Sequence, residues 1–277
     1  MPEAGRLSDT AKAAWRLVGS LLPTPSNPPA RETHGMPASL LGRMALRSLL
    51  CLVIAGAPGF PASSALATPA EPRRLHVVSD ENFPPYLFRN AEGQVEGYLV
   101  DLWQLWATRN RVQLTLTATN WADAQKMIAR GDADVIDMIY RTPAREPLYE
   151  FSKPYADLPV AIYTDTSIGG ISGVTTLKGF QIGVQDGDAC IDQLHANGIT
   201  TLQKYRNYTD LIAAAQRQEI KVFCLDEGPA NFYLYRAKAQ GDFRKAFELY
   251  KGQFHRAVRK GNLDTLRLVE EGMKAIT

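Results

Sequence analysis

The sequence predicts an α/β protein with two lobes, each built around a mostly parallel sheet flanked by helices. Three observations lead to this prediction. Apolar β-like runs alternate with helical patterns, the alternation occurs in two successive series, and polar loops follow the main β-like runs of both series. Because open parallel sheets bind ligands at the carboxyl ends of their strands, we expect one site shared between the two lobes.

The first series begins near residue 75. Prolines in 82–86 favour an extended loop. Apolar residues at helical spacing predict a helix from Tyr98, and a second helix is predicted over 121–130, where Gly131 supplies the chemistry of a C-terminal cap. The β-like runs of this series are 75–78, 112–117 and 135–139.

The second series follows the apolar run 158–163. Its strands are predicted at 180–184 and 220–225, with a further strand between them, and the chain is expected to cross between the lobes near 158–163 and 250–254. Rotation of the lobes about two such crossovers is the usual form of hinge closure. The helices of this series are predicted to run from the loop 185–190 to about residue 197, over 209–218, from residue 226 onward, and over 262–276.

The first 67 residues differ from the rest of the chain. Residues 1–35 are rich in proline and are interpreted as a misassigned or disordered extension. Residues 36–67 have the order of a secretory signal peptide: a positive start, an apolar core and small residues at a cleavage site. A retained membrane anchor is the alternative, although the apolar core is about half the roughly 20 residues that a span needs. The predicted location is therefore the periplasm.

The remaining residues are assigned to lobe 1 (68–160), lobe 2 (161–252) and a return to lobe 1 (253–277). Residues 1–67 hold six of the chain's 31 Lys and Arg and three of its 29 Asp and Glu, which leaves residues 68–277 with 25 and 26. Because the two charges nearly balance, we do not expect a basic surface that binds nucleic acid. The composition, 45% hydrophobic and 22% charged, is typical of a soluble globular protein.

Export also affects the interpretation of the cysteines. Removal of Cys51 leaves two, Cys190 and Cys224, in a compartment where disulfides persist. An even pair favours a bridge, and two buried thiols are the alternative. Neither cysteine belongs to a cluster with zinc spacing, so the sequence predicts no metal or other cofactor.

Seven segments occur in the order and spacing of one protein family. The chain resembles the bacterial solute-binding proteins of family 3, the type II periplasmic fold of polar amino-acid binders, over roughly 185 residues. The segments are 82–86 (NFPPY), 97–102 (GYLVDL), 131–134 (GDAD), 142–145 (TPAR), 151–155 (FSKPY), 177–179 (LKG) and 257–261 (AVRKG).

The resemblance implies roles for two charged residues. Arg145 would grip a ligand carboxylate with its guanidinium fork, and a surface ion pair with a nearby glutamate is the alternative. Asp226 would accept hydrogen bonds from the ligand ammonium, and a helix N-cap is its alternative role.

Other ligand-binding positions implied by the resemblance depart more from the family pattern. Phe83 would stack on the ligand or pack in the core. Met138 and Tyr140 stand where small hydroxyl residues are frequent, and Ala189 stands where a threonine is common. Asp188, at a helix start, would meet a cationic group of the ligand or offset the anion-binding helix N-terminus. These departures alter the expected shape of the pocket.

The second lobe is similar to the Venus-flytrap sensor domains of membrane signalling proteins. This resemblance rests on 187–192 (GDACID) and 222–227 (VFCLDE), and it implies a disulfide between Cys190 and Cys224. The expected partner is accordingly either a membrane permease of an ABC transporter or a signalling protein.

The predicted function is ligand binding by hinge closure, without catalysis. An enzyme of the same fold, acting through an acid such as Asp188 or Glu227, is one alternative, and a relative that has lost its ligand is another. A neutral or cationic amino acid is the expected ligand because acidic residues are concentrated on the loops of the cleft. These residues are Asp80, Glu81, Asp137, Asp186, Asp188, Asp226 and Glu227.

Overall fold

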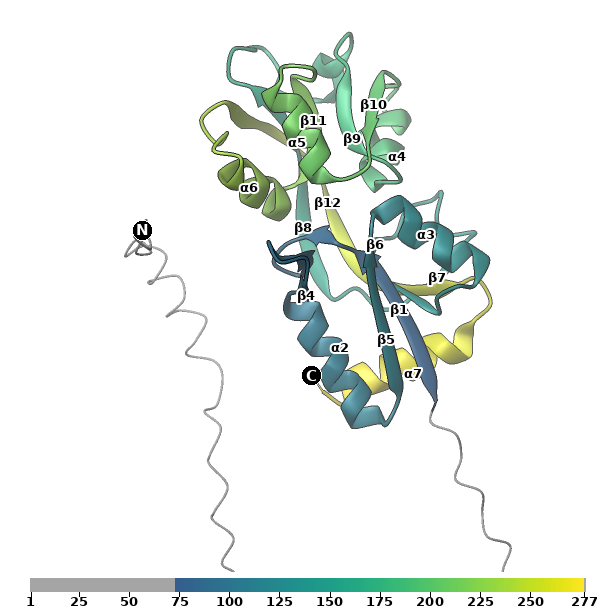
Figure 1. Ribbon diagram of the computed structural model, residues 1–277. Helices are drawn as coiled ribbons and strands as arrows, with labels where there is room; N and C mark the ends of the chain where they lie inside the picture. The colour runs from purple at the N-terminus through teal and green to yellow at the C-terminus, as the bar shows by residue number, and fades with distance from the viewer. Residues whose placement is uncertain (1–72, 277) are drawn as a thin grey trace, which may run out of the picture. The chain divides into compact units, whose positions relative to one another are not determined.

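Residues 73–276 are described by a computed structural model (Figure 1). The predicted extension (1–35) and signal peptide (36–67) lie outside the described residues. In chain order the first elements are β1 (Arg74–Asp80), β2 (Asn82–Phe83), β3 (Leu87–Arg89), β4 (Val95–Glu96), α2 (Tyr98–Asn110), β5 (Gln113–Thr119), α3 (Trp121–Arg130), β6 (Val135–Tyr140) and β7 (Tyr149–Phe151).

The second half of the chain continues the α/β alternation. It contains β8 (Ala156–Asp165), a 3₁₀ turn (Val174–Leu177), β9 (Ile182–Gln185), α4 (Ala189–Ala196), β10 (Leu202–Tyr205), α5 (Tyr208–Gln216), β11 (Val222–Asp226), α6 (Glu227–Arg236), β12 (Phe243–Arg259) and α7 (Leu263–Lys274).

Nine strands form one sheet that passes through both lobes. Its order is β10-β9-β11-β8-β12-β6-β1-β5, with β7 paired to β12. The pairs β1–β5, β1–β6, β9–β10 and β9–β11 are parallel, as the alternation of strands and helices predicts. Strands β8 and β12 are antiparallel to each other and to their outer neighbours. The sheet is therefore parallel in its outer parts and antiparallel where the lobes join.

The two hinge crossovers are β8 and β12, which run side by side between the lobes in Figure 1. Their pairing extends from Asp165 opposite Phe243 to Ala156 opposite Phe254. The predicted crossing points at 158–163 and 250–254 lie on these strands. Both strands extend across the proposed lobe boundaries at 160/161 and 252/253, and those boundaries remain predictions.

Lobe 1 as used below comprises β1–β7, α2, α3 and α7, and lobe 2 comprises β9–β11 and α4–α6. Helix α3 has the predicted bounds: Trp121, Ala124 and Ile128 are buried on one face. The helix ends at Gly131, whose φ of 83° is left-handed and therefore favours glycine. Strand β9 begins at Ile182, two residues later than predicted.

A small three-stranded sheet, β2-β3-β4, was not predicted from the sequence. Its strands have two or three residues each, too few to show a period of two. The sheet follows the end of β1 and places Phe83 beside the carboxyl end of that strand.

In lobe 2, a disulfide joins Cys190 in the first turn of α4 to Cys224 in β11. Both cysteines are about 1% exposed. The bridge ties the loop that precedes α4 to the strand that ends at Asp226.

Candidate functional site

The residues predicted to bind ligand come together in one pocket between the lobes. The pocket contains about 310 Å³ of space free of protein atoms, part of it open to solvent. All seven residues predicted to bind ligand line it, and their binding role remains a prediction. The lining residues are Asp80, Phe83, Trp121, Met138, Tyr140, Arg145, Gln185, Asp188, Ala189, Tyr208, Asp226 and Phe254.

Strand ends place the polar groups of this pocket. Asp80 ends β1, Tyr140 ends β6, Gln185 ends β9 and Asp226 ends β11. Strands β1 and β6 run parallel in lobe 1, and β9 and β11 run parallel in lobe 2. Their carboxyl ends therefore bring two polar residues from each lobe to the same cleft, as expected for open α/β sheets.

Arg145 lies in this cleft and is 5% exposed. Its Nη1 donates to the Tyr140 carbonyl at 2.9 Å, and its Nη2 donates to the Gly187 carbonyl of lobe 2 at 2.7 Å. The guanidinium carbon is 5.5 Å from the centre of the Trp121 ring. The alternative of a surface ion pair does not hold, because the two nearby glutamates pair with other cations, Arg141 and Lys260.

Asp226 is 2% exposed and points into the pocket. It occupies the N-cap position of α6, but its side chain makes no capping hydrogen bond. The Tyr140 hydroxyl donates to Oδ1, and the Tyr208 hydroxyl donates to Oδ2 at 2.6 Å. Burial, with the nearby Asp188 carboxyl, raises the pKa of Asp226 to about 7. The geometry therefore favours the pocket role over the cap.

Asp188 lies close to Asp226 and has two partners. Its Oδ1 accepts from the Cys190 N–H at 2.8 Å and so caps α4, while its Oδ2 lies 3.1 Å from the Tyr208 hydroxyl. Burial raises the pKa of the Asp188 carboxyl, and the Arg145 guanidinium opposes that shift.

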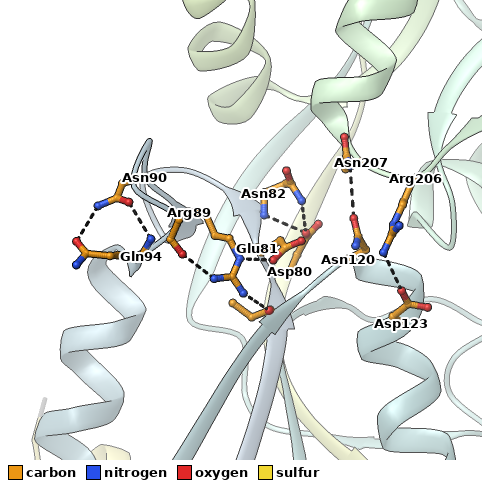
Figure 2. Close-up of polar contacts among 12 residues, drawn as sticks. Asp80, Glu81, Asn82, Arg89, Asn90, Gln94, Asn120, Asp123, Arg206 and Asn207 are labelled. Carbon is orange, nitrogen blue, oxygen red and sulfur yellow. Dashed lines mark hydrogen bonds and ion pairs between the residues drawn. The ribbon is translucent and has the colours of Figure 1, made fainter.

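Asp80 supplies the third buried carboxyl, this time from lobe 1. Gln185 Nε2 donates to its Oδ2 at 2.9 Å across the cleft. The Asn82 N–H donates to its Oδ1 at 3.0 Å (Figure 2). Burial raises the pKa of Asp80 to about 6 despite these hydrogen bonds.

Aromatic rings form the apolar wall of the pocket. Phe83 is 5% exposed and meets the Phe254 ring edge-on, with 5.1 Å between centroids. Tyr140 stacks on Phe254, with 5.0 Å between centroids and 22° between planes. Phe83 therefore packs against the core and also lines the pocket, while its stacking on a ligand remains a prediction.

Met138 and Ala189 complete the predicted set. Met138 has a left-handed φ of 61°, which costs a residue with a side chain on the order of 1 kcal/mol or more. Its N–H donates to Asp137 Oδ1 at 2.8 Å. Ala189 is the first residue of α4 and is 2% exposed.

The acidic character of the cleft comes from fewer residues than the sequence indicated. Only Asp80, Asp188 and Asp226 among the seven acidic residues line the pocket. The other four form ion pairs elsewhere: Glu81 with Arg89, Asp137 with Arg256, Asp186 with Lys204 and Glu227 with Lys245.

Further contacts join the lobes around the pocket. The Gly187 carbonyl of lobe 2 accepts from Trp121 Nε1 at 2.9 Å and from Gln125 Nε2 at 3.0 Å, in addition to Arg145. At the rim, Arg206 Nη2 lies 3.8 Å from Asp123 Oδ2 (Figure 2). The polar groups of the two lobes thus contact each other directly.

Sequence reasoning did not single out four of the lining residues. Gln185 ends a strand whose loop was recognised, so its position was a usable signal. Trp121 was treated only as the start of a helix. Tyr208 begins α5, one residue before the predicted helix start, and Phe254 lies in a predicted crossover between the lobes, but neither was given a place in the site.

Within residues 73–276, no group of three or more histidine, cysteine, aspartate or glutamate side chains is arranged to hold a metal ion. Over the same range, none of the helices is both long and apolar enough to cross a bilayer.

Comparison with known proteins gives a consistent result. Residues 75–277 match the family described as bacterial extracellular solute-binding proteins, family 3. The chain is 23% identical over 234 residues to a probable histidine-binding protein of Neisseria gonorrhoeae, which covers 83% of this chain and 87% of that protein. It is 28% identical over 152 residues to the L-cystine-binding protein TcyJ of Escherichia coli K12, which covers 52% of this chain and 56% of TcyJ.

Solved structures show the same fold. Holo ArgBP from T. maritima superposes with a TM-score of 0.66 at 22% identity, covering 73% of this chain and 90% of ArgBP. A histidine kinase sensor domain with similarity to periplasmic binding proteins has a TM-score of 0.69 at 18% identity, covering 74% of this chain and 90% of that domain.

Proposed function

The chain belongs to the bacterial extracellular solute-binding proteins, family 3, and from this membership we propose that its two lobes close on a small amino-acid ligand. The observation that carries the proposal is the position of Arg145 and Asp226, which reach one buried pocket from opposite lobes. A ligand that bridges them stabilises the closed arrangement over the open one.

Arg145 is proposed to bind the ligand carboxylate. Its two observed hydrogen bonds go to neutral carbonyl oxygens, and a guanidinium has five N–H donors. A carboxylate is a stronger acceptor than a carbonyl and can receive two parallel bonds from the fork. The Trp121 ring beside the guanidinium restricts its orientation.

Asp226 is proposed to bind the ligand ammonium. Each of its oxygens already accepts from a phenol, Tyr140 or Tyr208, and an ionised carboxylate has about four acceptor positions. An ammonium can therefore join these donors or displace one of them. Phe83 and Phe254 provide apolar surface for the ligand's carbon atoms.

The charges of the pocket favour a neutral or cationic amino acid over a dicarboxylate. Three carboxyl groups and one guanidinium line it. After Arg145 pairs with the ligand carboxylate and Asp226 with its ammonium, Asp80 and Asp188 remain for a positively charged side chain. The relatives named for histidine, cystine and arginine bind zwitterionic ligands, which supports the general class.

A thermal-shift screen of the 20 amino acids and common polyamines tests this proposal. A ligand at 100 times its Kd stabilises by about 2.7 kcal/mol, which corresponds to roughly 5–10 °C for a domain of this size. We expect the largest shifts from neutral or basic amino acids. Stabilisation by glutamate or aspartate alone would overturn the charge argument.

The protein is proposed to act in the periplasm, after removal of the signal peptide at 36–67. The family description supports an extracellular location. N-terminal sequencing of the exported protein tests cleavage: a mature end near residue 68 is expected, whereas a retained 36–67 segment would indicate a membrane anchor.

The closed state is proposed to be recognised by a membrane partner, either an ABC-transporter permease or a signalling protein. The fold is shared with a histidine kinase sensor domain, and this observation supports sensing as an alternative to transport. Cross-linking in host membranes, with and without the best ligand, distinguishes a permease from a signalling protein by which partner is recovered.

We propose binding without turnover, and conversion of a ligand by the purified protein would contradict this.

A further inference from the structure

We propose that protons also close this cleft: protonation of the carboxyl groups around Tyr208 stabilises the closed arrangement, so that acidic pH and a cationic ligand are alternative ways to bring the lobes together. The inference rests on the proposed hinge closure and extends it to a second closing agent. It starts from one hydroxyl group that has two carboxyl neighbours.

The Tyr208 hydroxyl lies 2.6 Å from Asp226 Oδ2 and 3.1 Å from Asp188 Oδ2. A phenol has a single O–H proton and can donate it along only one of these contacts. When Tyr208 donates to Asp226, its contact with Asp188 becomes a hydrogen bond if Asp188 is protonated and donates to the phenol oxygen. The geometry thus suits a chain from Asp188 through Tyr208 to Asp226 that contains one extra proton.

The remaining contacts of these carboxyl groups provide little positive charge. Asp188 Oδ1 accepts from a backbone N–H, Asp226 Oδ1 accepts from the Tyr140 phenol, and Asp80 accepts from the Gln185 amide. The charged groups that face the cluster are Asp80 from β1, Arg145 from the turn after β6, Asp188 at the N-cap of α4, Asp192 from α4 and Asp226 from β11. The phenols that face it are Tyr140, Tyr163, Tyr208, Tyr233 and Tyr250. One guanidinium therefore stands against four carboxyl groups.

Burial has the effect on these groups that the geometry implies. It raises the pKa of Asp80 to about 6 and that of Asp226 to about 7, and it raises the pKa of Asp188. Burial likewise raises the pKa values of Tyr140 and Tyr208, so both phenols keep their protons.

Opening the hinge changes this balance. The hydrogen bonds of Tyr140 to Asp226 and of Gln185 to Asp80 join the two lobes and therefore depend on closure. They lower the pKa values of these carboxyl groups, but burial in the closed cleft raises the same pKa values by more. When the lobes separate, water reaches the carboxyl groups and their pKa values return toward the ordinary range near 4.

The closed state therefore binds more protons than the open state between about pH 4 and pH 7. The ratio of closed to open protein should rise as the pH falls through this window, by up to roughly tenfold per pH unit for each proton taken up. A cationic ligand replaces those protons at neutral pH, because it neutralises the same carboxylates.

Lobe separation measured without ligand, as a function of pH, tests the proposal. Fluorescence energy transfer in the full chain can use dyes attached through non-natural amino acids at exposed Lys126 and Gln203, which flank the rim contact between Asp123 and Arg206. We expect transfer to increase from pH 8 to pH 5, with a midpoint between about pH 5.5 and 7.

Two variants each remove one titrating carboxyl group from the cleft. Asp226→Asn supplies a neutral group of the same shape, and Asp188→Asn does so while retaining a residue that caps helices well. Each should show greater transfer than the parent at pH 8 and a smaller change on acidification. Asp242→Asn, at an exposed position, is the matched control and should behave as the parent.

Circular dichroism at each pH confirms that the proteins remain folded. A folded parent with equal transfer at pH 5 and pH 8 would overturn the proposal, and so would a parent-like response in both variants. Calorimetry with lysine and other amino acids at pH 7.5 examines the ligand separately. Ligand binding without a pH response contradicts only proton closure, whereas a pH response without amino-acid binding contradicts only the proposed ligand.

Discussion

Gly252 lies on the hinge strand β12, opposite Leu158 of β8, and its missing side chain makes room for Tyr140. A Cβ at this position would lie 2.6 Å from both Cε1 and Cζ of the Tyr140 ring. Gly252 is not among the residues with a positive φ, so alanine suits its backbone. The effect of Gly252→Ala should therefore come from the collision with the ring.

The ring has little freedom to move away. It stacks on Phe254, and its hydroxyl donates to Asp226. Overpacking of a buried site costs about 1–3 kcal/mol, and loss of a hydrogen bond to a charged group costs about 1.5–3 kcal/mol. We expect Gly252→Ala to lower the free energy of unfolding by about 1–3 kcal/mol if the ring shifts and keeps its bond, and by more if the bond breaks.

Urea denaturation measures this loss, with Gly169→Ala as the control because a Cβ there meets no atom within 4 Å. Repeating Gly252→Ala in a Tyr140→Leu background isolates the collision, since the smaller side chain relieves it. An equal cost of Gly252→Ala in both backgrounds would refute the reasoning.

Three further predictions concern stability. Gly97→Ala places a Cβ 2.4 Å from the Tyr86 carbonyl oxygen, at a residue whose φ is 125°. The resulting strain should cost about 1–3 kcal/mol and lower the melting temperature by several degrees. An unchanged melting temperature would contradict this prediction. Replacing both Cys190 and Cys224 by alanine opens a loop with a sequence separation of 34 and should cost about 4 kcal/mol in the chain-entropy model, measured by denaturation against the oxidised parent. Burial raises the pKa of Asp80 to about 6 in the folded protein, so its protonated form contributes a stabilisation that is complete below pH 4 and lost as the pH rises through 6. On going from pH 8 to pH 4, the free energy of unfolding of the parent should therefore rise by on the order of 3 kcal/mol relative to that of Asp80→Asn. Parallel pH profiles of the two proteins would contradict this.

The parts of the fold that were predictable have a local signal in the sequence. Helix α3 was placed correctly because its apolar residues repeat at helical spacing and Gly131 supports its left-handed end. The small sheet β2–β4 lacks such a signal because its strands are too short. The length of β12, 17 residues, depends on pairing with β8, β6 and β7, which are distant in sequence.

The candidate site shows the same division. Arg145 and Asp226 were singled out because the resemblance to family 3 implies ligand contacts for them, and both line the pocket, while their binding role remains a prediction. Tyr208 could not be singled out, because its contact with Asp226 depends on how α5 packs against α6, β9 and β10. The double contact of its hydroxyl with Asp188 and Asp226 is a property of tertiary structure alone.

Calorimetric titration of the full chain with the best amino acid from the screen tests the central claim most directly, using the parent, Arg145→Ala and Arg145→Lys. Removal of one partner from a buried charged hydrogen bond costs about 2–5 kcal/mol, so Arg145→Ala should raise Kd by at least about 30-fold. Arg145→Lys keeps the charge without the fork and should recover part of the affinity. If Arg145→Ala binds the amino acid with the affinity of the parent, the proposed carboxylate site is wrong.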